Sequence, residues 1–508
     1  MNDETEKIQP EESTRSGWNR PISRRTVLTQ IGAAGVAVST LGMFESLVWQ
    51  PDRVAAAPMT SYPDIQFDIG KFVPPARYID DVLIGMPPVY TVFLTAQLTA
   101  TPTRRDQHAL ADALDTIEQN YPFRPEGVFL HVSYGRPYFN RLPGGMVRGS
   151  VVAEYMPVFK GDFQPVLQEA IPGPTDVSPT NPTIKKKTFN VPLTIEANDI
   201  LFTLRGDSLA NITDIIDWLR GSNRLHDRMV ASPALNGLFT FTSKRLTFVQ
   251  IGLPAKIGHR KNLAYADRLN PRSPMWMGFF SQQANGFSPA TIATFQGNDS
   301  ARFDGMLQYN GVTRPVVASD YFYDGSVQVL SHDILDLAQW YADSQPYSER
   351  AQLMFRSNPP PNPGYKNQFA NGGGPAALPN LVVLNLPDGA SDALLDAEEY
   401  HRVGHLQSLQ RVTRTADGSI VPQRIDGPGF DAMDVPDGSV QPKLQFSAFV
   451  PSAQNFAKAR LAAGAPDLCP ARVPNSLNGI EPFMTATRRQ NFLCPPRKHR
   501  AFPLLELL

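Results

Sequence analysis

A segment in which histidine and arginine side chains gather, residues 396–430, carries the residue types best suited to chemistry. A neutral imidazole is a good ligand for iron, and we expect His405 to be that ligand. Arg424 follows beyond an Asp-Gly turn. Its guanidinium stays charged out of water, so it can stabilise an oxygen that leaves an oxidant. His401 is the alternative ligand, because a single helix would place it on the same face as His405.

The competing interpretation gives these histidines no chemical role. The chain has 8 histidines, and most histidines in proteins lie at the surface or are satisfied within the core. Glu398 and Glu399, which precede His401, fit a solvated helix face better than a non-haem iron site. The segment therefore needs support from the elements around it.

The composition is that of a globular protein large enough for more than one core. The chain has 508 residues, of which 42% are hydrophobic and 19% charged. Its formal net charge of -1 gives no reason to expect nucleic acid as a partner. The 47 prolines predict long loops, including an insertion at residues 342–380. Cys469 and Cys494 fit no CxxC pattern, and either one disulfide or two free thiols is compatible with the sequence.

Residues 1–57 combine a polar leader with a segment typical of twin-arginine export. Arg24 and Arg25 precede an uncharged stretch rich in Gly and Ala, residues 26–44. We expect the twin-arginine translocase as a partner and an extracytoplasmic location, whether periplasm, cell envelope or secreted. The segment is either cleaved or retained as a membrane anchor, although its glycines make it weakly apolar for an anchor.

Strands and helices follow one another in the order of an α+β protein. Residues 104–121 place Leu110, Leu114 and Ile117 on one helical face, and neighbouring segments rich in β-branched and aromatic residues predict strands. In the first half we expect strands at 90–98, 127–134, 199–207, 238–242 and 246–249, and helices at 104–121 and 208–220. In the second half we expect a strand at 325–330, a helix beginning at 332–340, a strand at 442–450 and a helix at 452–463.

This order predicts two ferredoxin-like domains, each a repeat of strand, helix and strand, with long loop insertions. We place the N-terminal domain at residues 58–270 and the C-terminal domain at 271–465. Residues 466–508 are expected to form a C-terminal extension.

Several blocks, in this order, resemble the dye-decolorising (DyP-type) haem peroxidases. Gly404-His405-Leu406-Gln407 is similar to the family's His-Ile-Arg element, and Arg424 stands at the spacing of its haem-site arginine. The strand before Asp336, Leu337 and Trp340 resembles another family element. The remaining similar blocks are residues 127–139, 199–207 and 443–456.

The resemblance implies two ferredoxin-like domains of the dimeric α+β barrel type with haem b in the second. It implies an exported peroxidase that reduces hydrogen peroxide and oxidises an organic donor of unknown identity by one electron at a time. His405 would be the proximal iron ligand, and Arg424 the distal cation that promotes heterolysis.

The chain departs from the family at its distal motif. The motif Gly-Phe-x-Asp-Gly falls on residues 278–282, where Ser281 occupies the position of the aspartate. Serine is no base near neutral pH, so Asp304 is a candidate substitute, or Arg424 acts alone. Gln407 also replaces an arginine that can meet a haem propionate. The alternative function is therefore a non-catalytic relative, an envelope protein that binds haem or no cofactor.

Overall fold

The computed structural model describes most of the chain from residue 61 onward. The residues it describes are 44, 46–48, 61–79, 82–159, 162–233, 235, 237–281, 289–296, 305–309, 312–357, 383–384, 392–415 and 419–508. Arg24 and Arg25 lie outside this part. Within it, no helix combines the length and apolarity needed to cross a bilayer.

The N-terminal half is a four-stranded antiparallel sheet with two helices. Its elements are β3 (Tyr90–Leu98), α3 (Arg104–Asn120), β4 (Phe129–Gly135), β7 (Ile200–Gly206), α6 (Leu209–Leu219) and β10 (Phe239–Phe248). The strands lie in the order β10-β3-β7-β4. Numbered along the chain this is fourth, first, third, second, the order of a ferredoxin-like unit.

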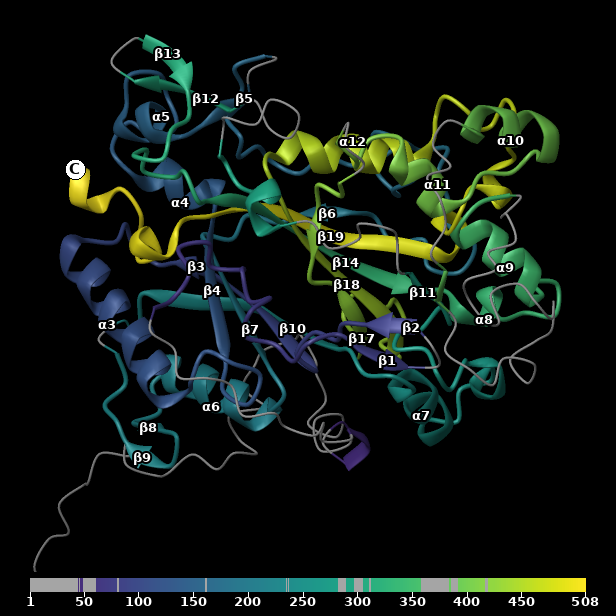
Figure 1. The fold of residues 1–508 in the computed structure, drawn as a ribbon, viewed down its shortest axis with the longest axis horizontal. Helices are drawn as coiled ribbons and strands as arrows, with labels where there is room; N and C mark the ends of the chain where they lie inside the picture. Colours follow the sequence, from purple (N-terminus) through teal and green to yellow (C-terminus); the bar gives the residue numbers. More distant parts are fainter. Residues whose placement is uncertain are drawn as a thin grey trace, which may run out of the picture.

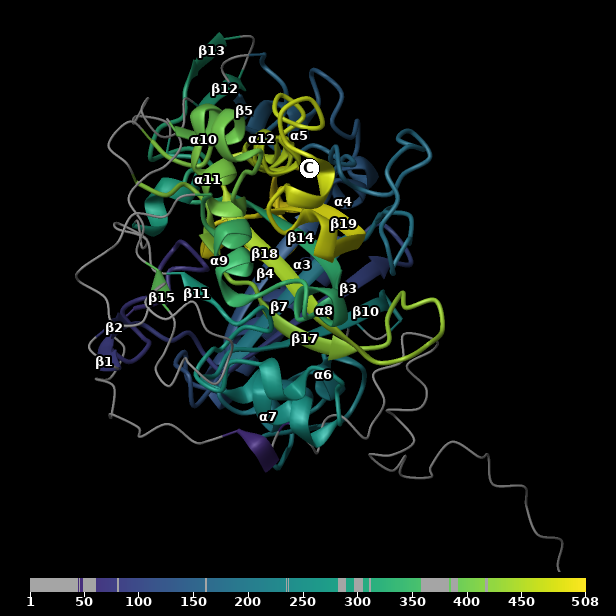
Figure 2. The ribbon, with the colours of Figure 1, turned by 90° about the vertical axis from the view of Figure 1, so that its right-hand side faces the viewer.

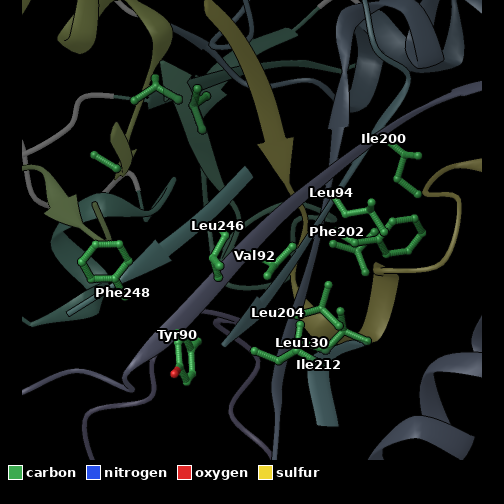
Figure 3. Close-up of a cluster of buried hydrophobic side chains, with 14 of the residues drawn as sticks. Tyr90, Val92, Leu94, Leu130, Ile200, Phe202, Leu204, Ile212, Leu246 and Phe248 are labelled. Carbon is green, nitrogen blue, oxygen red and sulfur yellow. The ribbon is translucent and has the colours of Figure 1, made fainter. Parts of the chain in front are cut away.

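The apolar periodicity of the sequence explains how this half packs. Thr103 caps α3 in a capping box with Asp106, and Leu110 and Leu114 are fully buried against the sheet. Figure 3 shows Leu130 and Leu204 of neighbouring strands beside Ile212 of α6. Each such side chain contributes roughly 1.5–3 kcal/mol by leaving water. The outer face of the sheet thereby becomes one hydrophobic core with its helices.

The C-terminal half repeats the same strand order. Its elements are β14 (Ser326–Leu335), α8 (Leu337–Trp340), α9 (Tyr347–Met354), α10 (Ala393–Tyr400), α11 (His405–Gln410), β16 (Gln423–Arg424), β17 (Gly427–Asp431), β18 (Gln441–Val450), α12 (Ala453–Gly464) and β19 (Met484–Cys494). β19 pairs with β14, β14 with β18, and β18 with both β16 and β17. This half is also ferredoxin-like, with β16 and β17 together as its second strand.

The two halves share one sheet. β19 pairs with β4 through Phe492 opposite Gly135, and the two outermost strands, β10 and β17, approach one another at the other side. A Cβ on Gly429 of β17 would lie 3.1 Å from the carbonyl oxygen of Leu246 in β10. The sheet therefore curves into a barrel, and Figure 1 shows α3 and α6 beside its N-terminal strands and α12 and α11 beside its C-terminal strands.

Shorter elements surround this barrel. The short strands are β1 (Arg77–Ile79), β2 (Val82–Ile84), β5 (Val158–Phe159), β6 (Thr194–Ile195), β8 (Arg224–Leu225), β9 (Arg228–Met229), β11 (Phe280–Ser281), β12 (Gly305–Tyr309), β13 (Val312–Pro315) and β15 (Val383–Leu384). The short helices are α4 (Arg136–Arg141), α5 (Val151–Tyr155) and α7 (Leu253–Arg260). The 3-10 turns are η1 (Ala266–Arg268), η2 (Ala290–Ala293), η5 (Asn475–Leu477), η6 (Glu481–Phe483), η7 (Arg497–His499) and η8 (Leu505–Leu507).

The predicted α+β class is confirmed, and two details of the prediction are corrected. Residues 466–508 are no mere extension, because β19 lies within them and joins the two halves. Residues 332–335 continue the strand β14 and do not begin a helix, since His332 finds a partner inside the barrel in Gln445, at 2.8 Å. The helix begins only after Asp336, whose side chain caps it.

The two cysteines are unpaired in the structure. Cys494 ends β19 and is buried, and Cys469 is half-buried. Burial raises the pKa of the Cys494 thiol to about 12 and that of the Cys469 thiol to about 11. Both are therefore thiols, and not thiolates, near neutral pH.

Candidate functional site

His405 is the first residue of α11, and two glycines allow the chain to fold tightly around it. A Cβ on Gly404 would lie 2.2 Å from the carbonyl oxygen of Phe355. Gly479 has a φ of +51°, and a Cβ there would lie 3.0 Å from the backbone nitrogen of His405. The Gly479 N–H donates to the Val403 carbonyl at 2.9 Å. These contacts fix the start of α11 against the segment that leads into β19 (Figure 2).

The imidazole of His405 is held in its neutral form. Burial lowers its pKa to about 4, and the positive charges of Arg460 and Arg424 act in the same direction, while Glu481 opposes them. Its Nδ1 is buried and finds no hydrogen-bond partner in the described part of the chain. Leaving a buried nitrogen without a hydrogen-bond partner costs about 1–3 kcal/mol of folding free energy, so this ring nitrogen is available to bind a ligand.

A buried network of ion pairs lies within electrostatic reach of His405. Arg460 donates to both oxygens of Glu481, at 3.0 and 3.3 Å, and also lies 3.7 Å from Asp176. Asp176 in turn accepts from Arg489 at 2.6 Å. Burial alone would raise the pKa of Glu481, but Arg460 and the ammonium of Lys186 hold it well below its usual range. Glu481 is therefore a carboxylate whose charge is already balanced.

Arg424 extends from the sheet on the side that faces α11. It lies opposite Ala448 in β18, whereas the next residue, Ile425, is buried in the barrel interior with Phe449. Successive strand residues point to opposite faces, so Arg424 and Asp426 share the outer face. Arg424 is exposed and close enough for its charge to lower the pKa of both His405 and Asp426.

Comparison with known families places the chain among proteins whose function is not established. The model of a family of unknown function, DUF7405, matches residues 167–496. The chain belongs to this family. The matched region includes both glycines that shape the start of α11, the strand that carries Arg424, the elements of the C-terminal half, and β7, α6 and β10 of the N-terminal half. No curated protein matches the chain.

Solved structures similar to this DUF7405 protein include three DyP-type peroxidases. The encapsulated enzyme from Mycobacterium smegmatis is 15% identical, with a TM-score of 0.44 over 82% of this chain and 96% of that chain. The protein from Cellulomonas bogoriensis is 12% identical, with a TM-score of 0.46 over 84% and 94%. The protein from Bacteroides thetaiotaomicron VPI-5482 is 11% identical, with a TM-score of 0.41 over 84% and 97%.

The site residues expected from the sequence fall into three groups in this DUF7405 protein. His405 and Arg424 come within electrostatic reach of each other. Ser281 closes β11, whose backbone pairs in parallel with β15, and Asp304 lies outside the described residues. His401 shares no helix face with His405, which corrects the expectation. It ends α10 with a φ of +51°, is exposed, and its Nδ1 lies 3.2 Å from the Arg472 carbonyl oxygen.

Three residues around this site, Asp426, Glu481 and Arg460, were not predicted from the sequence. Asp426 could have been found, because it stands two positions after Arg424 in an extended segment. Glu481 and Arg460 are remote in sequence from His405, and no motif joins them. Gln407 stands where the resemblance to DyP-type peroxidases implied an arginine. Its side-chain amide donates a hydrogen bond to Asp396 at 2.7 Å.

Proposed function

We propose that this protein is an exported, divergent DyP-like haem peroxidase, which reduces hydrogen peroxide with electrons from an organic donor. The observation that supports the proposal best is the relation of His405 to Arg424. A neutral imidazole with an unpartnered buried nitrogen stands on α11, and an exposed guanidinium on β16 acts electrostatically upon it. A metal ligand and a fixed positive charge are two of the groups that such a reaction requires.

The residues present fit a haem group in three respects. His405 is neutral near pH 7, which is the form that ligates iron. In the described part, no three His, Cys, Asp or Glu side chains converge to hold a bare metal ion, so an iron there would need a cofactor to supply its other ligands. Arg424 keeps its charge when desolvated, and its exposure leaves it available to an anionic group.

Each residue has a defined part in the proposed reaction. Haem would supply the redox chemistry, exchanging electrons with peroxide and with the donor. His405 would anchor it through a ring nitrogen. Arg424 would stabilise the negative charge that develops on the departing oxygen. The balanced charge of Glu481, paired with Arg460, would keep the ligand an imidazole rather than an imidazolate.

Haem reconstitution tests the proposal. We expect the purified protein to take up haem with a strong Soret band, and His405→Ala to lose that band. His401→Ala is the matched control, because His401 is exposed and hydrogen-bonded to the Arg472 carbonyl, and it should leave the band unchanged. An unchanged band in His405→Ala would remove His405 as the ligand.

A second candidate function is a non-catalytic relative that binds haem or no cofactor. The observation that favours it is Ser281, which stands where the DyP family has its distal aspartate. Turnover separates the two candidates. Peroxide and a reducing dye, added to the haem-loaded protein, should give a rate well above that of free haem if the protein is a peroxidase, and no more than that rate if it only binds.

Export remains a proposal supported by Arg24 and Arg25 alone. We propose that the twin-arginine translocase carries the folded protein out of the cytoplasm. Arg24→Lys with Arg25→Lys should retain the protein in the cytoplasmic fraction. Equal amounts of wild type and variant outside the cytoplasm would contradict this route.

A further inference from the structure

We propose that Asp426 is the acid-base group of the site, which moves a proton between the two oxygens of hydrogen peroxide in place of the aspartate replaced by Ser281. The inference rests on the proposed peroxidase function. It concerns a residue to which neither the sequence motifs nor the family match gives a role.

The register of the strands fixes where Asp426 lies. Arg424 pairs with Ala448, the Ile425 N–H donates to Ser447 at 2.9 Å, and Gly427 pairs with Gln445. The pairing therefore continues without a shift from β16 into β17, and Asp426 stands opposite Phe446. Ile425 occupies the barrel interior, so Asp426 and Arg424 are both on the outer face.

That outer face is the one that carries the helices. The ring of Phe446 stacks on Phe456 of α12, with 5.5 Å between centroids, and α12 packs against α11. His405 begins α11. A carboxyl, a guanidinium and an imidazole, from Asp426, Arg424 and His405, therefore belong to one layer between the sheet and the helices.

Asp426 and His405 also share an unusual environment. Both residues keep accessible surface, yet burial dominates the pKa of each, raising that of Asp426 and lowering that of His405. Asp426 therefore has both the low-dielectric surroundings and the access that proton transfer to a small substrate requires.

Three other carboxyl groups of this half are already paired with cations. Glu481 binds Arg460, Asp434 binds Arg488 at 2.7 Å, and Asp431 lies 3.7 Å from Lys443. Asp426, by contrast, makes no ion pair with any cation in the described part of the chain, although the charge of Arg424 reaches it. A carboxyl without a fixed cation is not held in its charged form, so it can both accept and donate a proton, as a general acid-base group must.

The proton balance of the step is complete. The carboxylate would accept the proton of one peroxide oxygen and donate it to the other oxygen, which leaves as water when the O–O bond breaks. Haem would supply the two electrons that reduce the remaining oxygen, which becomes the second water after it takes up two protons. Asp426 returns to its starting state. Over the whole cycle, hydrogen peroxide takes up two electrons and two protons and yields two waters. The organic donor of the proposed function supplies the electrons through haem.

Asp426→Asn tests the inference, because it keeps the shape of the side chain and removes its proton-transfer capacity. We expect the haem-loaded variant to keep the Soret band of the wild type and to react with peroxide about 10²–10⁴-fold more slowly. Cyanide gives an independent readout, since hydrogen cyanide must lose a proton as it binds iron. The rate at which cyanide associates with the haem-loaded Asp426→Asn variant should fall and should no longer depend on pH.

Asp333→Asn is the matched control. Burial raises the pKa of Asp333 to about 6, but its charged neighbours are Arg489 and Arg460, and not Arg424. We expect it to react with peroxide and cyanide as the wild type does. Asp426→Glu keeps the acid and should retain more activity than Asp426→Asn. If the asparagine variant folds poorly, Asp426→Glu decides the matter by itself, because cyanide association should still depend on pH in that variant, and loss of this dependence would contradict the inference.

The outcomes are distinct. Wild-type rates with peroxide and cyanide in haem-loaded Asp426→Asn would overturn the role of Asp426 and leave haem binding intact. If the wild-type protein takes up no haem, the proposed function fails, and the role of Asp426 fails with it.

Discussion

The guanidinium of Arg460 binds both oxygens of Glu481, at 3.0 and 3.3 Å, and the charges of both residues act on the pKa of His405. Both partners are almost completely removed from solvent, with side-chain exposures of 12% and 3%. The carboxylate that could have accepted a proton from the imidazole is thus committed elsewhere. His405 therefore owes its neutral state to burial and to neighbouring cations, and not to a carboxylate partner.

Glu481→Gln should strongly destabilise the protein, because it takes from the buried Arg460 the carboxylate that accepts two of its hydrogen bonds and leaves acidic groups farther away, such as Asp176 at 3.7 Å. We expect a loss of about 3–5 kcal/mol in the free energy of unfolding, measured by urea denaturation. Glu398→Gln is the control. Its partner is Arg472, both side chains are about half exposed, and the loss should stay below about 1 kcal/mol. Equal losses in the free energy of unfolding of the two variants would contradict the expectation that the buried ion pair contributes more than the exposed one.

The protein should become less stable as the pH falls from about 6.5 to about 4, in part because of His405. Its pKa is about 4 in the folded state and about 6.5 in the unfolded state, so the unfolded chain binds the proton first in this window. The contribution of His405 to the free energy of unfolding is fully present above about pH 6.5 and is lost as the pH falls toward about 4. His405→Gln should show a shallower decline in denaturation curves recorded across the window. An identical decline would mean that His405 titrates normally.

Gly479→Ala should disturb His405 directly. The substitution places a Cβ 3.0 Å from the His405 backbone and imposes a φ of +51° on alanine, so we expect a destabilisation above about 1 kcal/mol and weaker haem uptake. Gly438→Ala has the same kind of backbone penalty, with a φ of +70°, but open space around the new Cβ. It should destabilise less and leave haem uptake unchanged. Titration of both variants with haem distinguishes crowding at the site from backbone strain.

If the proposed function is correct, Arg424→Leu should slow the reaction with peroxide by about 10²–10³-fold while haem remains bound, since it removes the charge proposed to stabilise the leaving oxygen. Arg424→Lys keeps the charge but not the planar guanidinium, and it should fall between the wild type and the leucine variant. Stopped-flow absorption of the haem band measures both rates. Full speed in Arg424→Leu would exclude Arg424 from the reaction.

Sequence patterns predicted the fold well where one face of an element is apolar. The spacing of Leu110, Leu114 and Ile117 marked α3 correctly. The same reasoning failed for β14 beyond residue 330 and for β19, because both strands place polar residues inside the barrel. His332 and Gln445 form a hydrogen bond there, so the sequence of a strand in the core need not be apolar.

The candidate site was predictable only in part, for a related reason. His405 and Arg424 each stand near recognisable neighbours in sequence, and the fold brings them together. Asp426 was overlooked because its meaning depends on the alternation of β16, a strand too short to show a pattern by itself. Glu481 and Arg460 meet only through the packing of α12 against the segment before β19.

The central place of β19 also bears on when the protein can assemble. A ribosome that has made residues 1–464 has produced every other strand of the ten-stranded sheet, yet the strand that joins β4 to β14 is still to come. Glu481 and Gly479, which shape the surroundings of His405, emerge just before it. His405 thus gains its environment only after the segment before β19 has been made, and in the proposed function haem would enter a chain in which every other strand of this sheet is already synthesised.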